Sequence, residues 1–134
     1  MRITSSSTTS GERVLLFIGA ELAVFAILRI TLFLHPFINL NLGVYPIHHL
    51  FIGAFALVVA VTFFLLGFAN RTLILLAGMA SGLILDEIVY LIVTDGSDIA
   101  YLTPVSFVGA LILIMITLLI TGIGYHHAMR KKVG

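Results

Sequence analysis

Four residues that commonly bind metal ions or carry protons occur in this sequence as two adjacent pairs. The pairs are His48 with His49 and Asp86 with Glu87, and both lie in or beside long apolar stretches. Imidazole nitrogens and carboxylate oxygens are ordinary ligands of Zn, Mn and Fe, and the same groups exchange protons. Because ionisable groups are costly inside a membrane, we treat residues of this kind in apolar stretches as functional candidates.

The composition indicates a membrane protein. Of the 134 residues, 60% are hydrophobic and 10% are charged, whereas soluble proteins have about 45–50% and about 25%. The mean hydropathy is +1.21. A soluble domain of this size needs a polar surface that these residues cannot provide. The composition therefore argues against a soluble enzyme, a nucleic-acid-binding protein and a disordered regulator, and the absence of cysteine excludes disulfides and thiolate metal sites.

Four stretches are long and apolar enough to cross a bilayer as helices, which takes about 20 residues each. They cover residues 14–34, 46–68, 72–93 and 104–125. Continuous apolar runs without alternation favour helices over the strands of a membrane barrel. The sequence therefore predicts an all-α, up-down four-helix transmembrane bundle, with one domain at 11–129 between a mobile tail at 1–10 and a basic tail at 130–134.

Residues at the ends of these stretches are typical of helix starts. Thr9 and Glu12 have capping-box spacing before the first stretch. Pro46 and Pro104 suit the first turn of the second and fourth helices, where a missing N–H group costs nothing. The first stretch is too long for the apolar part of a signal peptide and contains charged residues, so we expect it to be retained as a helix.

The basic residues indicate how the helices are oriented. All but one lie before the first stretch, between the second and third, or after the fourth, at Arg2, Arg13, Arg71, Arg130, Lys131 and Lys132. Since basic residues collect on the cytoplasmic side, both termini and the turn between the second and third helices are predicted to be cytoplasmic. We expect a multi-pass plasma-membrane protein in contact with lipids, without a nucleic-acid partner, either as a homo-oligomer or in a larger membrane complex.

Arg29 is the basic residue that departs from this pattern, and its depth matches that of the two candidate pairs. It lies about one and a half turns from the outer end of the first span, and Asp86 and Glu87 lie about two turns from the outer end of the third. His48 and His49 begin the inward run of the second span. We therefore expect all five residues in one layer in the outer half of the bilayer.

Residue spacing also indicates which helix faces lie inside the bundle. The residues that recur every four positions on one face of the third span are Gly78, Gly82, Asp86 and Tyr90. The two glycines form a G-x-x-x-G pattern that lets another helix approach closely, so Asp86 and Tyr90 are expected to face inward. Glu21 shares a face of the first span with Arg29 and lies deeper, as a relay residue or as a protonated acid bonded to Thr117 or to another helix.

Charge counting leads to three interpretations of the site. The three intramembrane carboxylates against one arginine leave two excess negative charges, which are costly in a low dielectric. One divalent Zn, Mn or Fe ion would offset them. Its predicted ligands are His48, His49, Asp86 and Glu87, and its supporting residues are Arg29, Tyr90 and Glu21. Such a protein would suit chemistry on a lipid or another amphiphile, but the sequence does not identify a reaction.

The two alternatives need no metal. One is a non-catalytic membrane subunit in which an ion pair between Arg29 and a carboxylate holds the helices together. The other is an oligomer that conducts protons or cations, although the cytoplasmic halves of the later spans contain few polar residues for a pore.

Two segments resemble a group of small prokaryotic integral membrane proteins with four helices. Residues 47–53 match an I-H-H-x-x-I-G pattern on one helix, and residues 82–87 match a G-L-x-x-D-E pattern on the next. An acidic loop with an aromatic residue follows, as at 95–101. The resemblance covers about half of the chain and implies the same four candidate residues. No established activity of that group implies a mechanism here.

The predicted orientation can be tested by cysteine labelling. The variants Asn39→Cys and Ser97→Cys should react with a membrane-impermeant thiol reagent added outside intact cells, because both positions lie in the predicted outer loops. Lys132→Cys should not react until the membrane is permeabilised. The opposite labelling pattern would show that the orientation and the depth argument built on it are wrong.

Overall fold

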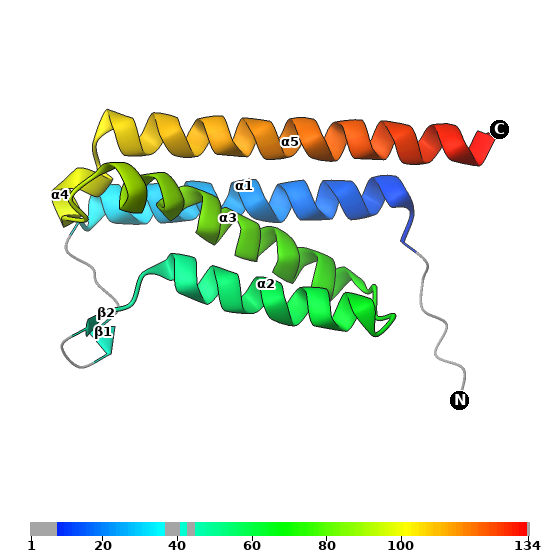
Figure 1. The fold of residues 1–134 in the computed structure, drawn as a ribbon, viewed down its shortest axis with the longest axis horizontal. Helices are drawn as coiled ribbons and strands as arrows, with labels where there is room; N and C mark the ends of the chain where they lie inside the picture. Colours follow the sequence, from blue (N-terminus) through cyan, green and yellow to red (C-terminus); the bar gives the residue numbers. More distant parts are fainter. Residues whose placement is uncertain (1–7, 37–40, 43–44, 134) are drawn as a thin grey trace.

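The computed structural model describes residues 8–36, 41–42 and 45–133, which are mainly helical (Figure 1). The helices are α1 (Ser10–Leu34), α2 (His49–Leu65), α3 (Arg71–Val93), α4 (Asp98–Tyr101) and α5 (Pro104–Val133). The all-α prediction is confirmed. Three helices, α1, α3 and α5, are long and apolar enough to cross a membrane, whereas α2 has 17 residues and is a shorter apolar helix.

The second helix begins later than the sequence predicts. Two short strands, β1 (Asn41–Leu42) and β2 (Tyr45–Pro46), pair antiparallel ahead of it. Pro46 therefore lies in extended backbone rather than in a first helical turn, and this part of the prediction is wrong. His48 is the N-cap residue with φ −69° and ψ 133°, so helical geometry is reached only at His49.

The other helix boundaries follow the predicted signals. The Thr9 hydroxyl accepts a hydrogen bond from the backbone N–H of Glu12 at 3.2 Å, as a capping residue should. Pro104 is the first residue of α5. That helix continues to Val133, so it includes the basic residues that the sequence analysis assigned to a tail. Of the predicted N-terminal tail, residues 1–7 lie outside the described residues.

The central element is α3, which packs against α1, α2 and α5. Figure 1 shows α3 crossing between α2 on one side and α1 with α5 on the other. Along the long axis of the molecule, α1 and α3 run in one direction and α2 and α5 in the other. The ends of α1 and α3 therefore lie at the same end of the molecule as the starts of α2 and α5.

Glycines on α3 allow α1 to approach its backbone. A Cβ atom at Gly78 would lie 2.3 Å from the carbonyl oxygen of Phe17, and one at Gly82 would lie 2.7 Å from that of Glu21. Neither position has room for a larger residue while the helices keep this distance. The predicted close approach at the G-x-x-x-G pattern is thus confirmed, and its partner is α1.

The other two contacts of α3 use glycines of the neighbouring helices. A Cβ atom at Gly53 of α2 would lie 2.8 Å from the carbonyl oxygen of Ala80, and one at Gly109 of α5 would lie 2.3 Å from Cγ1 of Val89. Large apolar side chains on α1, α2 and α5 remain exposed on the outside of the molecule. A soluble monomer rarely exposes so many large apolar side chains to water. This outer surface therefore suits contact with lipid.

The variant Gly78→Ala should force α1 and α3 apart, because the added methyl group would meet the carbonyl oxygen of Phe17. Overpacking of this kind costs about 1–3 kcal/mol of unfolding free energy, which reversible unfolding in detergent can measure. Gly122→Ala on α5 is the control, since no atom lies within 4 Å of the added group. An equal loss of stability in both variants would contradict the close α1–α3 contact.

Candidate functional site

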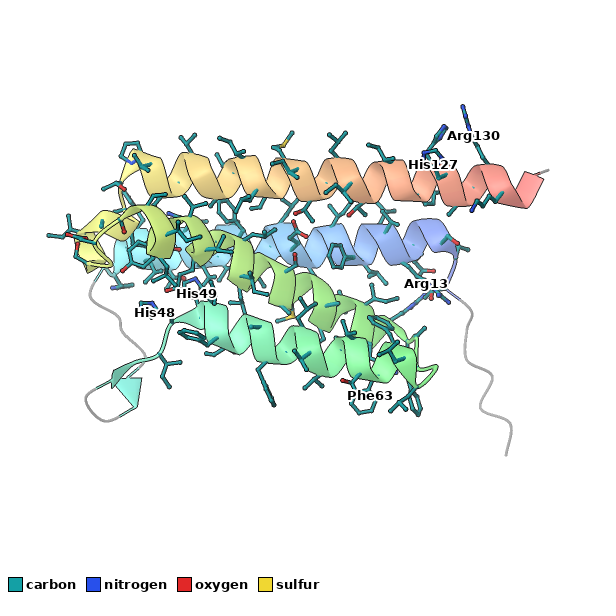
Figure 2. The ribbon with its side chains drawn as sticks, viewed as in Figure 1. Arg13, His48, His49, Phe63, His127 and Arg130 are labelled. Atoms are coloured by element: carbon teal, nitrogen blue, oxygen red, sulfur yellow. The ribbon has the colours of Figure 1, made fainter. Side chains whose placement is uncertain are left out.

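The residues that the sequence analysis assigned to one layer contact one another at one end of the helices. Asp86 and Glu87 of α3 are buried, with 0% and 3% of their surface exposed. His48 and His49 lie beside them at the start of α2 (Figure 2), and their side chains are 27% and 19% exposed. Arg29 approaches from α1, near the end of that helix. The site is thus open to its surroundings through the histidines.

A buried ion pair joins α1 to α3. Nε of Arg29 donates to Oδ1 of Asp86 at 2.5 Å, and Nη2 donates to the backbone carbonyl of Asp86 at 2.9 Å. Charge-assisted hydrogen bonds of this type are roughly twice as strong as neutral ones. The predicted contact between Arg29 and a carboxylate of the third span is confirmed.

The remaining donors of Arg29 reach α4 and α5. Nη1 donates to the backbone carbonyl of Tyr101 at 3.0 Å, and Nη2 donates to the hydroxyl of Ser106 at 3.2 Å. The guanidinium carbon lies 4.2 Å from the centre of the Tyr101 ring, with Phe25 and Phe107 at 5.6 and 5.7 Å. Aromatic faces stabilise a cation at such distances. Arg29 therefore connects the end of α1 to three other helices.

His49 lies between the two carboxylates. Its Nε2 atom is 3.0 Å from Oδ2 of Asp86, and its Nδ1 atom is 3.3 Å from Oε2 of Glu87. An ionised carboxylate only accepts hydrogen bonds, and a neutral imidazole has only one N–H group to donate. The contact with Asp86 is a hydrogen bond, and the contact with Glu87 is a close approach of the two side chains. His49 therefore contacts both carboxylates of α3 at once.

Glu87 also fixes the start of α2. Its Oε2 atom accepts from the backbone N–H of Leu50 at 2.7 Å, and its Oε1 atom lies 2.6 Å from Nδ1 of His48. The side chain of His48, the N-cap residue, makes no capping hydrogen bond of its own. A carboxylate from another helix thus satisfies a free N–H group of the first turn, where negative charge is favourable.

Tyr101 completes a polar network with these five residues. Its hydroxyl donates to Oδ2 of Asp86, and its ring packs edge-on against His49 and Tyr90. Burial, and next the negative charge of Asp86, raise the pKa of the Tyr101 hydroxyl above its ordinary value, so it remains a donor. We call Arg29, His48, His49, Asp86, Glu87 and Tyr101 the polar network.

Tyr90 lies beside the network, as predicted from its helix face. Its ring centre is 6.3 Å from that of His48 and 5.3 Å from that of Tyr101, and its hydroxyl donates to the carbonyl of Gly96 in the following loop. Tyr90 therefore connects the network to the loop between α3 and α4. Its position fits a supporting residue.

Glu21 is not part of the polar network. It is fully buried, forms none of the ion pairs among the described residues, and neither carboxyl oxygen makes a hydrogen bond there. Ser81 of α3 is the polar side chain next to it. Thr117, one partner that the sequence suggested, donates its hydroxyl to the carbonyl of Leu113 at 3.0 Å instead.

Metal binding stays a prediction. Among the described residues, no group of three or more His, Asp or Glu side chains is arranged to hold a metal ion. The donor atoms of His48, His49, Asp86 and Glu87 are turned toward one another and toward Arg29 and Tyr101. A metal ion bound by these four side chains would have to replace these contacts.

Ser106 and Tyr101 bind Arg29 and Asp86 but are not recognisable as site residues in the sequence. Both lie in or beside the connection between α3 and α5, and a serine or tyrosine in such a connection has no distinctive spacing. Their position could have indicated a role, because both lie at the same end of the helices as Arg29 and Asp86. An arginine with five donors needs more acceptors than one carboxylate provides.

No protein-family model, curated protein or solved structure matches the chain.

The ion pair of Arg29 with Asp86 can be tested by a double-mutant cycle. Arg29→Leu should cost about 3–5 kcal/mol of unfolding free energy, because it removes the arginine partner of a buried carboxylate. Adding Asp86→Asn should recover part of that loss, as measured by unfolding in detergent. Arg71→Leu is the control, since Arg71 pairs with Glu12 at the exposed opposite end, where an ion pair contributes about 0–1 kcal/mol. Strictly additive losses for Arg29 and Asp86 would contradict the pairing.

Proposed function

We propose that the chain is an integral protein of the plasma membrane that crosses the bilayer four times, with both termini in the cytoplasm. Support comes from three long apolar helices and from the exposed apolar side chains around the molecule. Arg13 and Arg130 lie at the end opposite His48 and His49 (Figure 2). If the basic end is cytoplasmic, the polar network lies in the outer half of the membrane.

In this arrangement α2 also crosses the membrane, as the second of the four crossings along the chain, although it is the shortest of these helices. Its 17 residues span about 26 Å at 1.5 Å per residue, which is less than the apolar thickness of about 30 Å. Residues before and after the helix supply the difference. The polar network at its start then lies near the boundary between the apolar core and the outer surface, where protons from outside can reach the histidines.

The function that this geometry supports best is reversible proton binding that controls how firmly α2 is held to α3. The decisive observation is that His49 has one ring nitrogen 3.0 Å from Asp86 and the other 3.3 Å from Glu87. With His49 protonated, two positive groups, Arg29 and His49, balance two carboxylates. The network is then neutral, which is the inexpensive state in a low dielectric.

Loss of that proton would destabilise the contact between the two helices. One ring nitrogen of His49 would present a lone pair to a carboxylate oxygen, and one negative charge would be left uncompensated. The charged and titratable groups around this proton are Arg29, His48, Asp86, Glu87 and Tyr101. Of the side-chain types present here, only histidine ordinarily changes charge between about pH 5 and 8. The protein would thus respond to the acidity of the outer compartment as a non-catalytic membrane protein or subunit.

A divalent metal ion is the second candidate ligand. The observation in its favour is that four ligand side chains from two adjacent helices converge, with nitrogen–oxygen separations of 2.6 to 3.3 Å. Zn, Mn or Fe would replace the proton on His49 and compensate the same negative charge. Binding of such an ion would then weaken on acidification.

The pH dependence of stability tests the proposal. The unfolding free energy in detergent should fall as the pH rises from about 5 to 8, because the folded state holds the proton of His49 between two carboxylates. His49→Gln should abolish most of this dependence. His126→Gln should retain it, since His126 is exposed on α5 and lies at the opposite end of the molecule.

Two results would decide against proton binding. A wild-type stability that does not change over this pH range would show that the network does not depend on the proton. Stoichiometric Zn, Mn or Fe in the purified protein, lost in His49→Ala but not in His126→Ala, would establish the metal ion instead.

A further inference from the structure

Glu21 is a buried acid that the proposed function does not use. Its residue is 0% exposed in the middle of α1, and neither carboxyl oxygen has a hydrogen-bond partner among the described residues. An ionised carboxylate in that position would carry a desolvation cost of several kcal/mol without compensation. The carboxyl group is therefore held as a neutral acid, which has a proton to give up.

The surroundings of Glu21 contain no second charge. On α3 its neighbours are Gly82, whose added Cβ would meet the Glu21 carbonyl oxygen, and Ser81. Two contacts near the ends of α1 indicate which residues of α5 lie opposite each residue of α1. Arg29 binds Ser106, and the position of an added Cβ at Gly11 is 3.2 Å from the Tyr125 hydroxyl.

Counting from these two contacts places the buried Ile114 of α5 opposite Glu21. Neither α3 nor α5 therefore has a titratable group facing Glu21 in the described part of the chain. The nearest charged residues on the same face of α1 are Arg13 and Arg29, each eight positions from Glu21.

An apolar layer at the level of Phe25 and Ala110 separates Glu21 from the polar network. Phe25, Ala110 and Ile114 form a buried cluster, and Leu85 and Leu118 pack against it. Phe25 lies four residues from Glu21 and four from Arg29, so the three side chains follow one face of α1. The axial distance from Glu21 to Arg29 is about 12 Å. A layer of this kind prevents free passage of water between the two polar positions.

Hydroxyl groups lie on α5 between the level of Glu21 and the basic end of the molecule. Thr117, Thr121 and Tyr125 recur every four residues on α5, and all three are partly buried, unlike the residues on the outward face. The series begins within one turn of Ile114 and ends at Tyr125 beside Gly11, near the start of α1. Hydroxyl groups both donate and accept hydrogen bonds, so such a series can support a chain of water molecules.

We propose that Glu21 is a proton carrier and that the chain transfers protons across the membrane between the basic end and the polar network. The inference rests on the orientation in the membrane that the proposed function gives to the chain. In the transfer step the O–H bond of Glu21 breaks, and the proton passes through water in a transient opening beside Phe25 to the polar network. The polar network then releases one proton to the outside. The Glu21 carboxylate takes a proton from a hydronium ion on the cytoplasmic side, which leaves a neutral water molecule, and no electrons are exchanged.

The test measures proton flux into vesicles. The purified full chain is placed in phosphatidylcholine vesicles that contain a pH-sensitive dye, and a potassium gradient with valinomycin supplies the driving potential. Wild-type vesicles should acidify faster than empty vesicles. Glu21→Gln should reduce the rate to that of empty vesicles, because the amide cannot release a proton at neutral pH. Glu21→Asp should keep a measurable rate.

The matched control is Glu12→Gln, which changes an exposed acid on the same helix and should leave the flux unchanged. Infrared spectra give a readout that does not depend on transport, since the C=O band of a protonated carboxyl group should be present in the wild type and lost in Glu21→Gln. A wild-type rate equal to that of empty vesicles would overturn the proposal, and so would a wild-type rate in Glu21→Gln.

The two proposals fail in different measurements. Wild-type vesicles without flux, from a protein whose stability still depends on pH through His49, would overturn the transport proposal alone. A flux that requires Glu21, in a protein whose stability does not depend on His49, would leave proton transfer in place and remove the role of His49. If Glu21→Gln does not fold, the comparison of wild type and Glu21→Asp with empty vesicles decides the question.

Discussion

The structure depends most on the burial of the Arg29 guanidinium group against the Asp86 carboxylate. A charged pair in apolar surroundings is tolerated only when its geometry is good and its remaining donors and acceptors are satisfied. Arg29 meets that condition by binding Asp86, the carbonyl of Tyr101 and the hydroxyl of Ser106. The end of α1 is thereby held to α3, α4 and α5 at once. Removing the Asp86 carboxylate would leave the buried Nε donor of Arg29 without its partner, which is costly.

Glu87 has the same importance for α2. Asp86 and Glu87 are adjacent, so they point to different sides of α3. Asp86 meets Arg29 of α1, and Glu87 meets the first turn of α2. Because α3 lies between these two helices, both carboxylates are buried and both find partners. His49, at the start of α2, contacts both carboxylates, so the two sides of α3 meet again at one imidazole.

These polar contacts require the helices to be close together, and small residues provide that closeness. Gly78 and Gly82 admit α1 to the surface of α3, Gly53 admits α3 to α2, and Gly109 admits α3 to α5. Inside a membrane there is little hydrophobic driving force between helices, so close packing and polar contacts supply the association energy. The glycines and the polar network therefore stabilise the same helix interfaces. The glycines do so along the length of the helices, and the polar network does so at one end of them.

Much of the fold could be predicted from the sequence, because the length and apolarity of a segment decide whether it is a membrane helix. The rise per residue likewise placed Arg29, His48, His49, Asp86 and Glu87 at one level, and the structure brings them into contact. Other features depended on packing. The β1–β2 pair delays the start of α2 to His49, and the partners of Arg29 in the α3–α5 connection were not recognisable by spacing. Residue spacing determines how deep a side chain lies and which face of its helix it occupies. Only the tertiary structure determines which atoms face each other across helices, and it is this contact that directs both ring nitrogens of His49 to carboxylates.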